Sequence, residues 1–239
     1  MPEKKTYTPP GWMMRGAKFL SAALTPILIP FIAFVCLIYG TQLRYMFPSV
    51  TSVPLAGSPV LLILLGIIFC FTILLPALTI FLYKTMHRLS WDDLLLRRVR
   101  FVPYAVTIIS YGFCLALIHR IARHVVYGYL MSGLILSVLI CLLICFFVNL
   151  KWKINVHMAG IGGATGMLVA ISLFFGQNQT PTLCGLILLS GLLGTSRILL
   201  GRHTFYEVLF GYLTGLLTAV LVLQIPSLAF FSFYMEKLF

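Results

Sequence analysis

Seven long apolar stretches make up most of the sequence, and each is long enough to cross a lipid bilayer as a helix. A membrane-spanning helix needs about 20 apolar residues, because it rises about 1.5 Å per residue through about 30 Å of hydrocarbon. Backbone groups inside a bilayer must find hydrogen-bond partners within the chain, and the alternating pattern of a membrane β-barrel is absent, so we expect helices. The stretches are Phe19–Tyr39, Val60–Tyr83, Phe101–Ile118, Val126–Val148, Val156–Phe175, Leu183–Leu200 and Phe205–Ile225.

The composition supports the same class of fold. Of the 239 residues, 61% are hydrophobic and 9% are charged, whereas a soluble domain is about 25% charged. We therefore predict an all-α, polytopic integral membrane helix bundle of about seven spanning helices. A cytosolic enzyme, a secreted disulfide-stabilised domain and a disordered chain are excluded. Pro26, Pro30 and Pro76 should kink the first two helices, which membrane helices tolerate.

The basic residues fall mainly on one side of the predicted bundle. There are 17 Lys and Arg residues against 5 Asp and Glu, and with seven spans the N-terminal segment, the connector 84–100 and residues 149–155 and 201–204 share a side. Three explanations stay open: the positive-inside rule, attraction to anionic lipid headgroups, and an anionic substrate. The connector itself is either an interfacial helix or a substrate-facing segment. The bases form no continuous stripe, so no nucleic-acid partner is expected.

The most informative polar residues lie where the sixth stretch ends and the seventh begins. Arg197 ends the sixth predicted helix, His203 opens the seventh, and Glu207 follows four residues later. Residues at i and i+4 share a helical face, so the Glu207 carboxylate can accept the proton of one His203 ring nitrogen and leave the other nitrogen its lone pair. An acid inside a membrane helix is costly unless it is paired. The pair is either an oriented nucleophile or a structural hydrogen bond that fixes the seventh helix.

A second polar group precedes the fifth stretch on the same predicted side. Lys153, Asn155 and His157 come in close succession and are followed by several glycines. Small residues let membrane helices approach closely, so we expect these glycines to pack rather than to hold phosphate. His157 alone would be an ordinary interfacial residue. Its position on the same face as His203 makes it a candidate site residue.

These residues resemble the type 2 phosphatidic acid phosphatase superfamily, whose members are membrane lipid phosphatases related to vanadium haloperoxidases. The signature of that superfamily is roughly K-x6-R-P, then P-S-G-H, then S-R-x5-H-x3-D. The third part is matched by Ser196, Arg197, His203 and Glu207, with Glu in place of Asp.

The first two parts of the signature are matched less closely. The second is represented by His157, preceded by Ile154, Asn155 and Val156. The first is represented by three arginines before Pro103, with two residues between the last arginine and the proline. These are Arg97, Arg98 and Arg100.

The resemblance implies an organisation for the chain. Residues 84–239 would form a phosphatase-like membrane domain that carries the site, with a six-helix core and extra helices. Residues 1–83 would be a basic N-terminal segment and two spanning helices. Residues 101–148 would be two additional spans between the first and second parts of the signature.

The resemblance also implies roles for the site residues. His203 would attack phosphorus and form a phosphohistidine, while Glu207 would hold and stabilise its ring. His157 would protonate the leaving oxygen and then activate water. Cationic and amide side chains would bind the phosphoryl oxygens, and no metal or cofactor would be needed. These phosphate-binding residues would be Arg197, Arg100, Arg97, Lys153 and Asn155.

The expected activity is metal-independent hydrolysis of a phosphate monoester or diphosphate of a lipid. Phosphatidate, phosphatidylglycerol phosphate, a polyprenyl diphosphate and a phosphorylated saccharolipid are all candidate substrates, and the sequence does not choose among them. We expect the bacterial inner (cytoplasmic) membrane. The count of basic residues favours a site on the cytoplasmic face, whereas bacterial members of the superfamily usually carry the site on the periplasmic face. The sequence predicts no oligomeric state.

Two alternatives remain open at this stage. His157, His203 and Glu207 would form a two-His, one-carboxylate set of a kind that binds a metal ion. A chain with the same fold that binds or transports lipid phosphate without turnover is the second alternative, since intramembrane charge also marks transport pathways.

Overall fold

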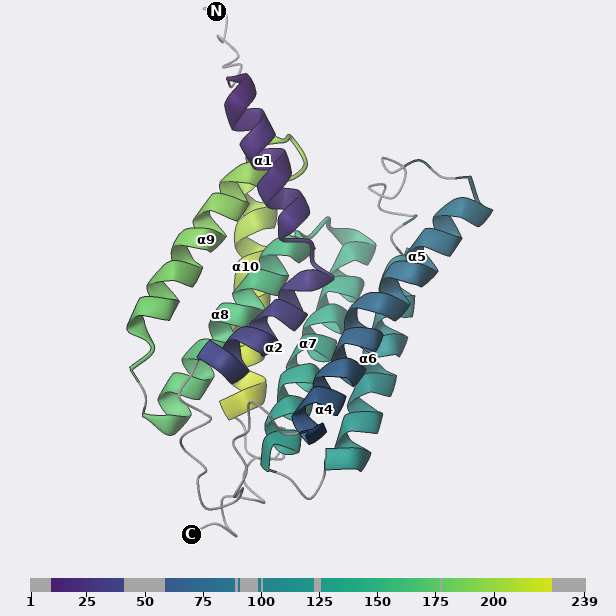
Figure 1. Cartoon of the computed structure of the whole chain (residues 1–239). Helices are drawn as coiled ribbons and strands as arrows, with labels where there is room; N and C mark the ends of the chain where they lie inside the picture. The colour runs from purple at the N-terminus through teal and green to yellow at the C-terminus, as the bar shows by residue number, and fades with distance from the viewer. Residues whose placement is uncertain are drawn as a thin grey trace, which may run out of the picture.

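The computed structural model describes residues 10–40, 59–88, 90, 99, 101–122, 126–176 and 178–224. All regular secondary structure in these ranges is helical, which confirms the predicted all-α class. Figure 1 shows the long helices running side by side, with their ends gathered at the two ends of a bundle.

Six uninterrupted helices in the described ranges are long and apolar enough to cross a membrane. The first is composite, because α4 (Pro59–Phe69), a π-helical segment (Cys70–Leu74) and α5 (Leu75–Met86) follow one another without a break. The other five are α6 (Phe101–Ala122), α7 (Val126–Lys151), α8 (Val156–Phe175), α9 (Thr180–Leu199) and α10 (Phe205–Gln224). These lengths and this composition agree with an integral membrane protein.

The first predicted span, Phe19–Tyr39, is not one helix. α1 (Gly11–Ala23) and α2 (Leu28–Gly40) meet at an angle of 73°, so the pair makes a seventh span only if both halves cross the membrane together. Pro26 has no N–H and disfavours helical geometry at the residue before it. Pro30 lies in the first turn of α2, where a proline is tolerated. The prediction of one kinked helix was therefore wrong, because the chain breaks between two helices.

The third proline, Pro76, has a milder effect. A proline ring clashes with the carbonyl of the residue four positions earlier, and a wider π-helical turn relieves that clash. The π-helical segment Cys70–Leu74 contains Thr72, four residues before Pro76, and the Leu75 N–H donates to the Cys70 carbonyl. The Ser110 hydroxyl of α6 donates to the carbonyl of Phe71, so a carbonyl of the wide turn is satisfied from a neighbouring helix. The composite helix continues through the proline.

Helices α8 and α10 pack with their backbones in contact. A Cβ added to any of four glycines on these helices would lie less than 3.0 Å from a backbone atom of the other helix or of its N-cap residue. Each helix contributes two of them, spaced four residues apart, as in close membrane helix pairs. The four are Gly162 and Gly166 of α8 and Gly211 and Gly215 of α10. The predicted packing role of the glycines after His157 is confirmed for Gly162 and Gly166.

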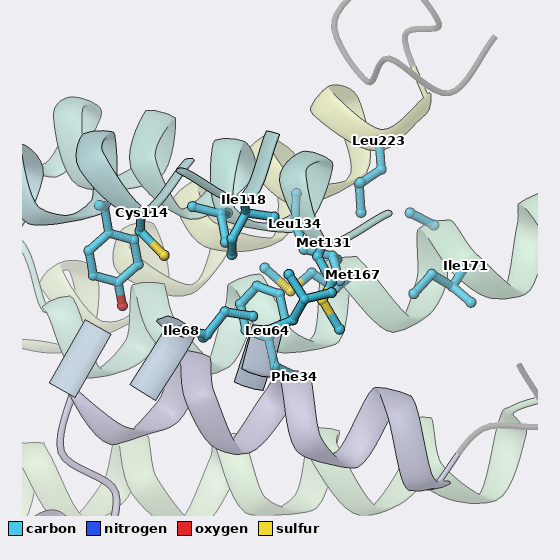
Figure 2. Close-up of a cluster of buried hydrophobic side chains, with 14 of the residues drawn as sticks. Phe34, Leu64, Ile68, Cys114, Ile118, Met131, Leu134, Met167, Ile171 and Leu223 are labelled. Atoms are coloured by element: carbon cyan, nitrogen blue, oxygen red, sulfur yellow. The ribbon is translucent and has the colours of Figure 1, made fainter. Parts of the chain in front are cut away.

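A buried hydrophobic cluster joins this pair to the other long helices. Figure 2 shows Phe34 of α2 pointing at side chains of α4, α6, α7 and α8. Phe34 and Ile68 are fully buried there. α2 is thus part of the bundle core, whereas α1 contributes no residue to the cluster.

We predict that replacing Gly215 by leucine separates α8 from α10 and lowers the thermal stability of the purified protein. Its Cβ would meet the Ala159 carbonyl and the backbone nitrogen of Gly163, and overpacking of this kind typically costs about 1–3 kcal/mol. Thermal unfolding in detergent measures the effect. A Cβ at Gly185 of α9 would meet nothing within 4 Å, so Gly185→Leu is the control. Equal unfolding temperatures for the two variants would contradict the packing account.

Candidate active site

Two turns at one end of the bundle carry the predicted site residues. Figure 1 shows the C-terminal ends of α7 and α9 and the N-terminal ends of α8 and α10 at the same end, next to α1. The Lys153 Nζ donates to the carbonyl of Arg202 at 2.7 Å, which joins the α7–α8 turn directly to the α9–α10 turn. Residues 149–155 and 201–204 therefore share a side, as the sequence predicted.

The α9–α10 turn has the form of a Schellman motif. Gly201 adopts a φ of 63°, and its N–H donates to the Ile198 carbonyl at 2.9 Å, while the Arg202 N–H donates to the Arg197 carbonyl at 3.2 Å. Glycine is favoured at this position because a left-handed backbone is costly for other residues. The motif ends α9 just after Arg197 and turns the chain toward His203. The last residues of α9 and the Schellman turn thus account for the six-residue spacing from Arg197 to His203.

A capping box begins the next helix. The Thr204 N–H donates to Glu207 Oε2 at 3.3 Å, and the Glu207 N–H donates to the Thr204 hydroxyl at 3.4 Å, which is the reciprocal pattern of a threonine cap and a glutamate three residues later. His203 precedes the cap, and its Nδ1 donates to the same Glu207 oxygen at 2.7 Å. The predicted pairing of His203 with Glu207 is confirmed. Its predicted cause was wrong, because His203 lies before α10 and not on its face.

The hydrogen bond to Glu207 sets the chemical state of the His203 ring. A neutral imidazole that donates from Nδ1 has its lone pair on Nε2. The side chain of His203 is 2% exposed and that of Glu207 is 13% exposed, so the pair lies largely out of water. A buried, oriented imidazole of this kind can act as a nucleophile or a base.

The α7–α8 turn presents His157 at the start of α8. Asn155 is the N-cap residue, and its side-chain oxygen accepts from the backbone N–H groups of His157 and Met158 at 3.1 and 3.3 Å. Asn155 is fully buried, and its side-chain nitrogen has no hydrogen-bond partner among the described residues. Asn155 therefore positions His157 by capping the helix, while the predicted donor role of its amide stays a prediction.

Arg197 is held from a distant part of the sequence. It is 6% exposed, and its Nη1 donates to the Ser21 hydroxyl of α1 at 2.6 Å across 176 residues. The side chain lies in the last turn of α9, where the helix dipole favours a positive charge. The guanidinium is thus fixed at the end of the bundle where the two turns meet.

A cavity of about 250 Å³ brings three of the predicted site residues together. His157, Arg197 and His203 all line it. The remaining walls are mostly apolar and come from α2, the composite helix, α6, α7, α8 and α10. A cation and two imidazoles at one end of an apolar space can bind an anion attached to a hydrocarbon group.

The other predicted site residues are distributed differently. Glu207, Lys153 and Asn155 do not line the cavity, and each instead makes the hydrogen bonds described above to the turns that frame it. Arg97 and Arg100 lie outside the described residues, as does most of the connector 84–100.

The metal alternative required His157 to join His203 and Glu207. In the ranges that the structure describes, no three His, Cys, Asp or Glu side chains come together in a way that could hold a metal ion. Of the predicted site residues, two histidines and an arginine line the cavity.

Two residues that matter for the geometry were missed at the sequence level. Thr204 had a usable signal, because a threonine followed three residues later by glutamate and an apolar run is typical of a capping box. Ser21 had no such signal, because no local sequence pattern identifies a serine as the partner of an arginine 176 residues away.

No protein-family model matches this chain, and comparisons with curated proteins and with solved structures likewise give no match.

We predict that Gly201→Ala destabilises the turn between Arg197 and His203. A left-handed conformation costs a residue with a Cβ about 1–2 kcal/mol, so the variant should unfold at a lower temperature than the wild type. Gly191→Ala in α9, where a Cβ meets nothing within 4 Å, is the matched control and should be neutral or slightly stabilising. An unchanged melting temperature for Gly201→Ala would mean that the turn tolerates alanine without strain.

Proposed function

We propose that this chain is a membrane-embedded lipid phosphatase, which hydrolyses a phosphate monoester or diphosphate of a lipid through a phosphohistidine intermediate. The observation that carries the proposal is the 2.7 Å hydrogen bond from His203 to Glu207 beside the cavity that His157 and Arg197 also line. The same residues support membership of the type 2 phosphatidic acid phosphatase superfamily, with a phosphatase-like core among the long helices.

In the first step, His203 Nε2 would attack the phosphorus atom of the bound lipid phosphate. A bond forms between nitrogen and phosphorus as the bond from phosphorus to the lipid oxygen breaks. His157 would give its proton to that leaving oxygen, so that the lipid alcohol departs neutral. Glu207, which accepts from His203 Nδ1, would stabilise the positive charge that develops on the ring.

In the second step, the neutral His157 would take a proton from water as the water oxygen attacks phosphorus. The bond between His203 and phosphorus breaks, inorganic phosphate leaves, and both histidines return to their starting states. Throughout both steps Arg197 would bind the phosphoryl oxygens, where charge accumulates in the transition state. Its hydrogen bond to Ser21 supports this assignment, because an arginine held in place loses less entropy when it binds an anion.

A second candidate is a lipid-phosphate-binding or transport protein of the same fold without turnover. The departure from the second part of the superfamily signature favours it, since Ile154, Asn155 and Val156 precede His157 where that signature has Pro, Ser and Gly. Release of inorganic phosphate separates the two candidates, because only the phosphatase produces it.

We predict that His203→Ala and Glu207→Gln lose nearly all phosphate release from lipid phosphates. Removing the nucleophile abolishes the first step, and replacing the carboxylate leaves the ring poorly oriented, at a cost of up to about 10⁴-fold in kcat. His157→Ala should lose about 10²–10⁴-fold. Arg120, in the last turn of α6 at the other end of the bundle, offers Arg120→Ala as a control with wild-type activity. Undiminished turnover by purified His203→Ala would refute the proposal.

We also predict that vanadate inhibits the wild-type enzyme and that a metal chelator does not. Vanadate adopts the five-coordinate geometry of phosphorus during transfer, and the cationic side chains supply the charge that metal ions supply in kinases. Inhibition constants for phosphate release, measured with and without chelator, test both statements. Loss of activity in chelator with rescue by one metal would contradict the metal-independent mechanism.

A further inference from the structure

The cavity beside His203 continues far beyond the space that a phosphate needs. On α8 its lining runs from His157 to Met167, and ten residues of helix correspond to about 15 Å. On α10 it reaches Ala219, which lies in the second half of that helix. This depth is about half of the 30 Å hydrocarbon thickness of a bilayer.

The walls of the deep part are small and apolar. α8 and α10 line it with residues that have little or no side chain, so their backbones form part of the surface. These residues include Ala159, Gly160, Gly163, Ala164, Gly215 and Ala219. Gly163 and Gly215 belong to the closely packed helix pair, and a Cβ at Gly215 would meet the Ala159 carbonyl and the Gly163 nitrogen.

The break between α1 and α2 supplies the facing wall. Pro26, Pro30 and Ala33 line the cavity opposite α8 and α10. The side chains of these three residues consist of hydrocarbon alone, so they present no polar side-chain atom to the cavity. The part of the cavity between α2 and α8 therefore suits a hydrocarbon and offers little to a polar ligand.

The volume sets how much hydrocarbon the cavity holds. An apolar cavity of about 150 Å³ accommodates one benzene molecule of six carbon atoms. By the same measure, about 250 Å³ holds about ten carbon atoms. A linear chain of that size would run from the two histidines toward Met167 and Ala219 and would take up this volume by itself.

We propose that this cavity binds the hydrocarbon chain of a single-chain lipid phosphate, with the phosphate at His157, Arg197 and His203 and the chain inside the helix bundle. The position of the phosphate rests on the proposed function, whereas the position of the chain rests on the cavity alone. The ligand class is a long-chain alkyl or prenyl phosphate or diphosphate. A two-chain glycerolipid would have to leave one chain outside.

Photolabelling tests the position of the chain without any need for turnover. Linear alkyl phosphates carry a diazirine either next to the phosphate or about ten carbons away, and the full-length protein in lipid nanodiscs is digested and mapped by mass spectrometry. The near probe should label residues around His157, and the far probe should label residues around Met167 and Ala219. Labelling by the far probe of the exposed α10 residues Leu213 and Leu217 instead of Ala219 would overturn the proposal.

Filling the deep end tests the same proposal by kinetics. Ala219→Leu and Ala164→Leu narrow the cavity far from the histidines, so each should raise the KM for a long-chain alkyl phosphate about tenfold. The KM for a butyl phosphate should stay unchanged. Leu217→Phe, on an exposed position of the same helix, is the matched control, and thermal unfolding confirms that each variant folds. Equal effects on long and short substrates would overturn the chain site.

The outcomes separate this inference from the proposed function. Depth-dependent labelling without phosphate release from any substrate would leave the chain site standing and refute the phosphatase. Phosphate release with no dependence on chain length would leave the phosphatase standing and refute the chain site. Equal KM values for phosphatidate and a single-chain phosphate of matched length would overturn the single-chain class.

Discussion

The backbone contact between α8 and α10 is the constraint on which the rest of the arrangement depends. Four glycines let the two helices touch along their length, and in a bilayer such close packing replaces the hydrophobic drive that water would supply. Because His157 lies in the first turn of α8 and His203 lies just before α10, the same contact determines how far apart the two imidazoles lie. The Lys153–Arg202 hydrogen bond then fixes the two turns to each other at the end of the pair.

The candidate site is assembled from helix-terminal motifs rather than from a loop of its own. A Schellman turn follows Arg197, a capping box follows His203, and an asparagine cap precedes His157. Each motif satisfies backbone groups that a bilayer would otherwise leave without partners. The positions of His157 and His203 are therefore determined by these motifs, while Arg197 is also held by Ser21 of α1.

Much of this could be predicted from the sequence, because the signals concerned are local. The length of the apolar stretches predicted the helices, and the four-residue spacing of His203 and Glu207 predicted their pairing. Features that depend on competing or distant interactions were less accessible. The sequence does not show how strongly each proline disrupts its helix. Pro26 was expected to kink a helix, but the chain breaks there, while at Pro76 the helix continues through a wider turn. The Ser21–Arg197 bond and the depth of the cavity depend on three-dimensional packing that no short motif records.

The bend between α1 and α2 has a consequence for how this protein is handled. Among the residues of α1 only Ala17 is buried, and Trp12 and Phe19 are largely exposed, so α1 rests on the bundle with little packing of its own. It nevertheless carries the hydroxyl that fixes the guanidinium of Arg197. Trp12 and Phe19 face the surfactant or lipid chosen for purification, so that choice acts on α1 and, through the Ser21 hydroxyl, on the guanidinium. Anion affinity, rather than helical content, is therefore the property to compare between preparations in different amphiphiles.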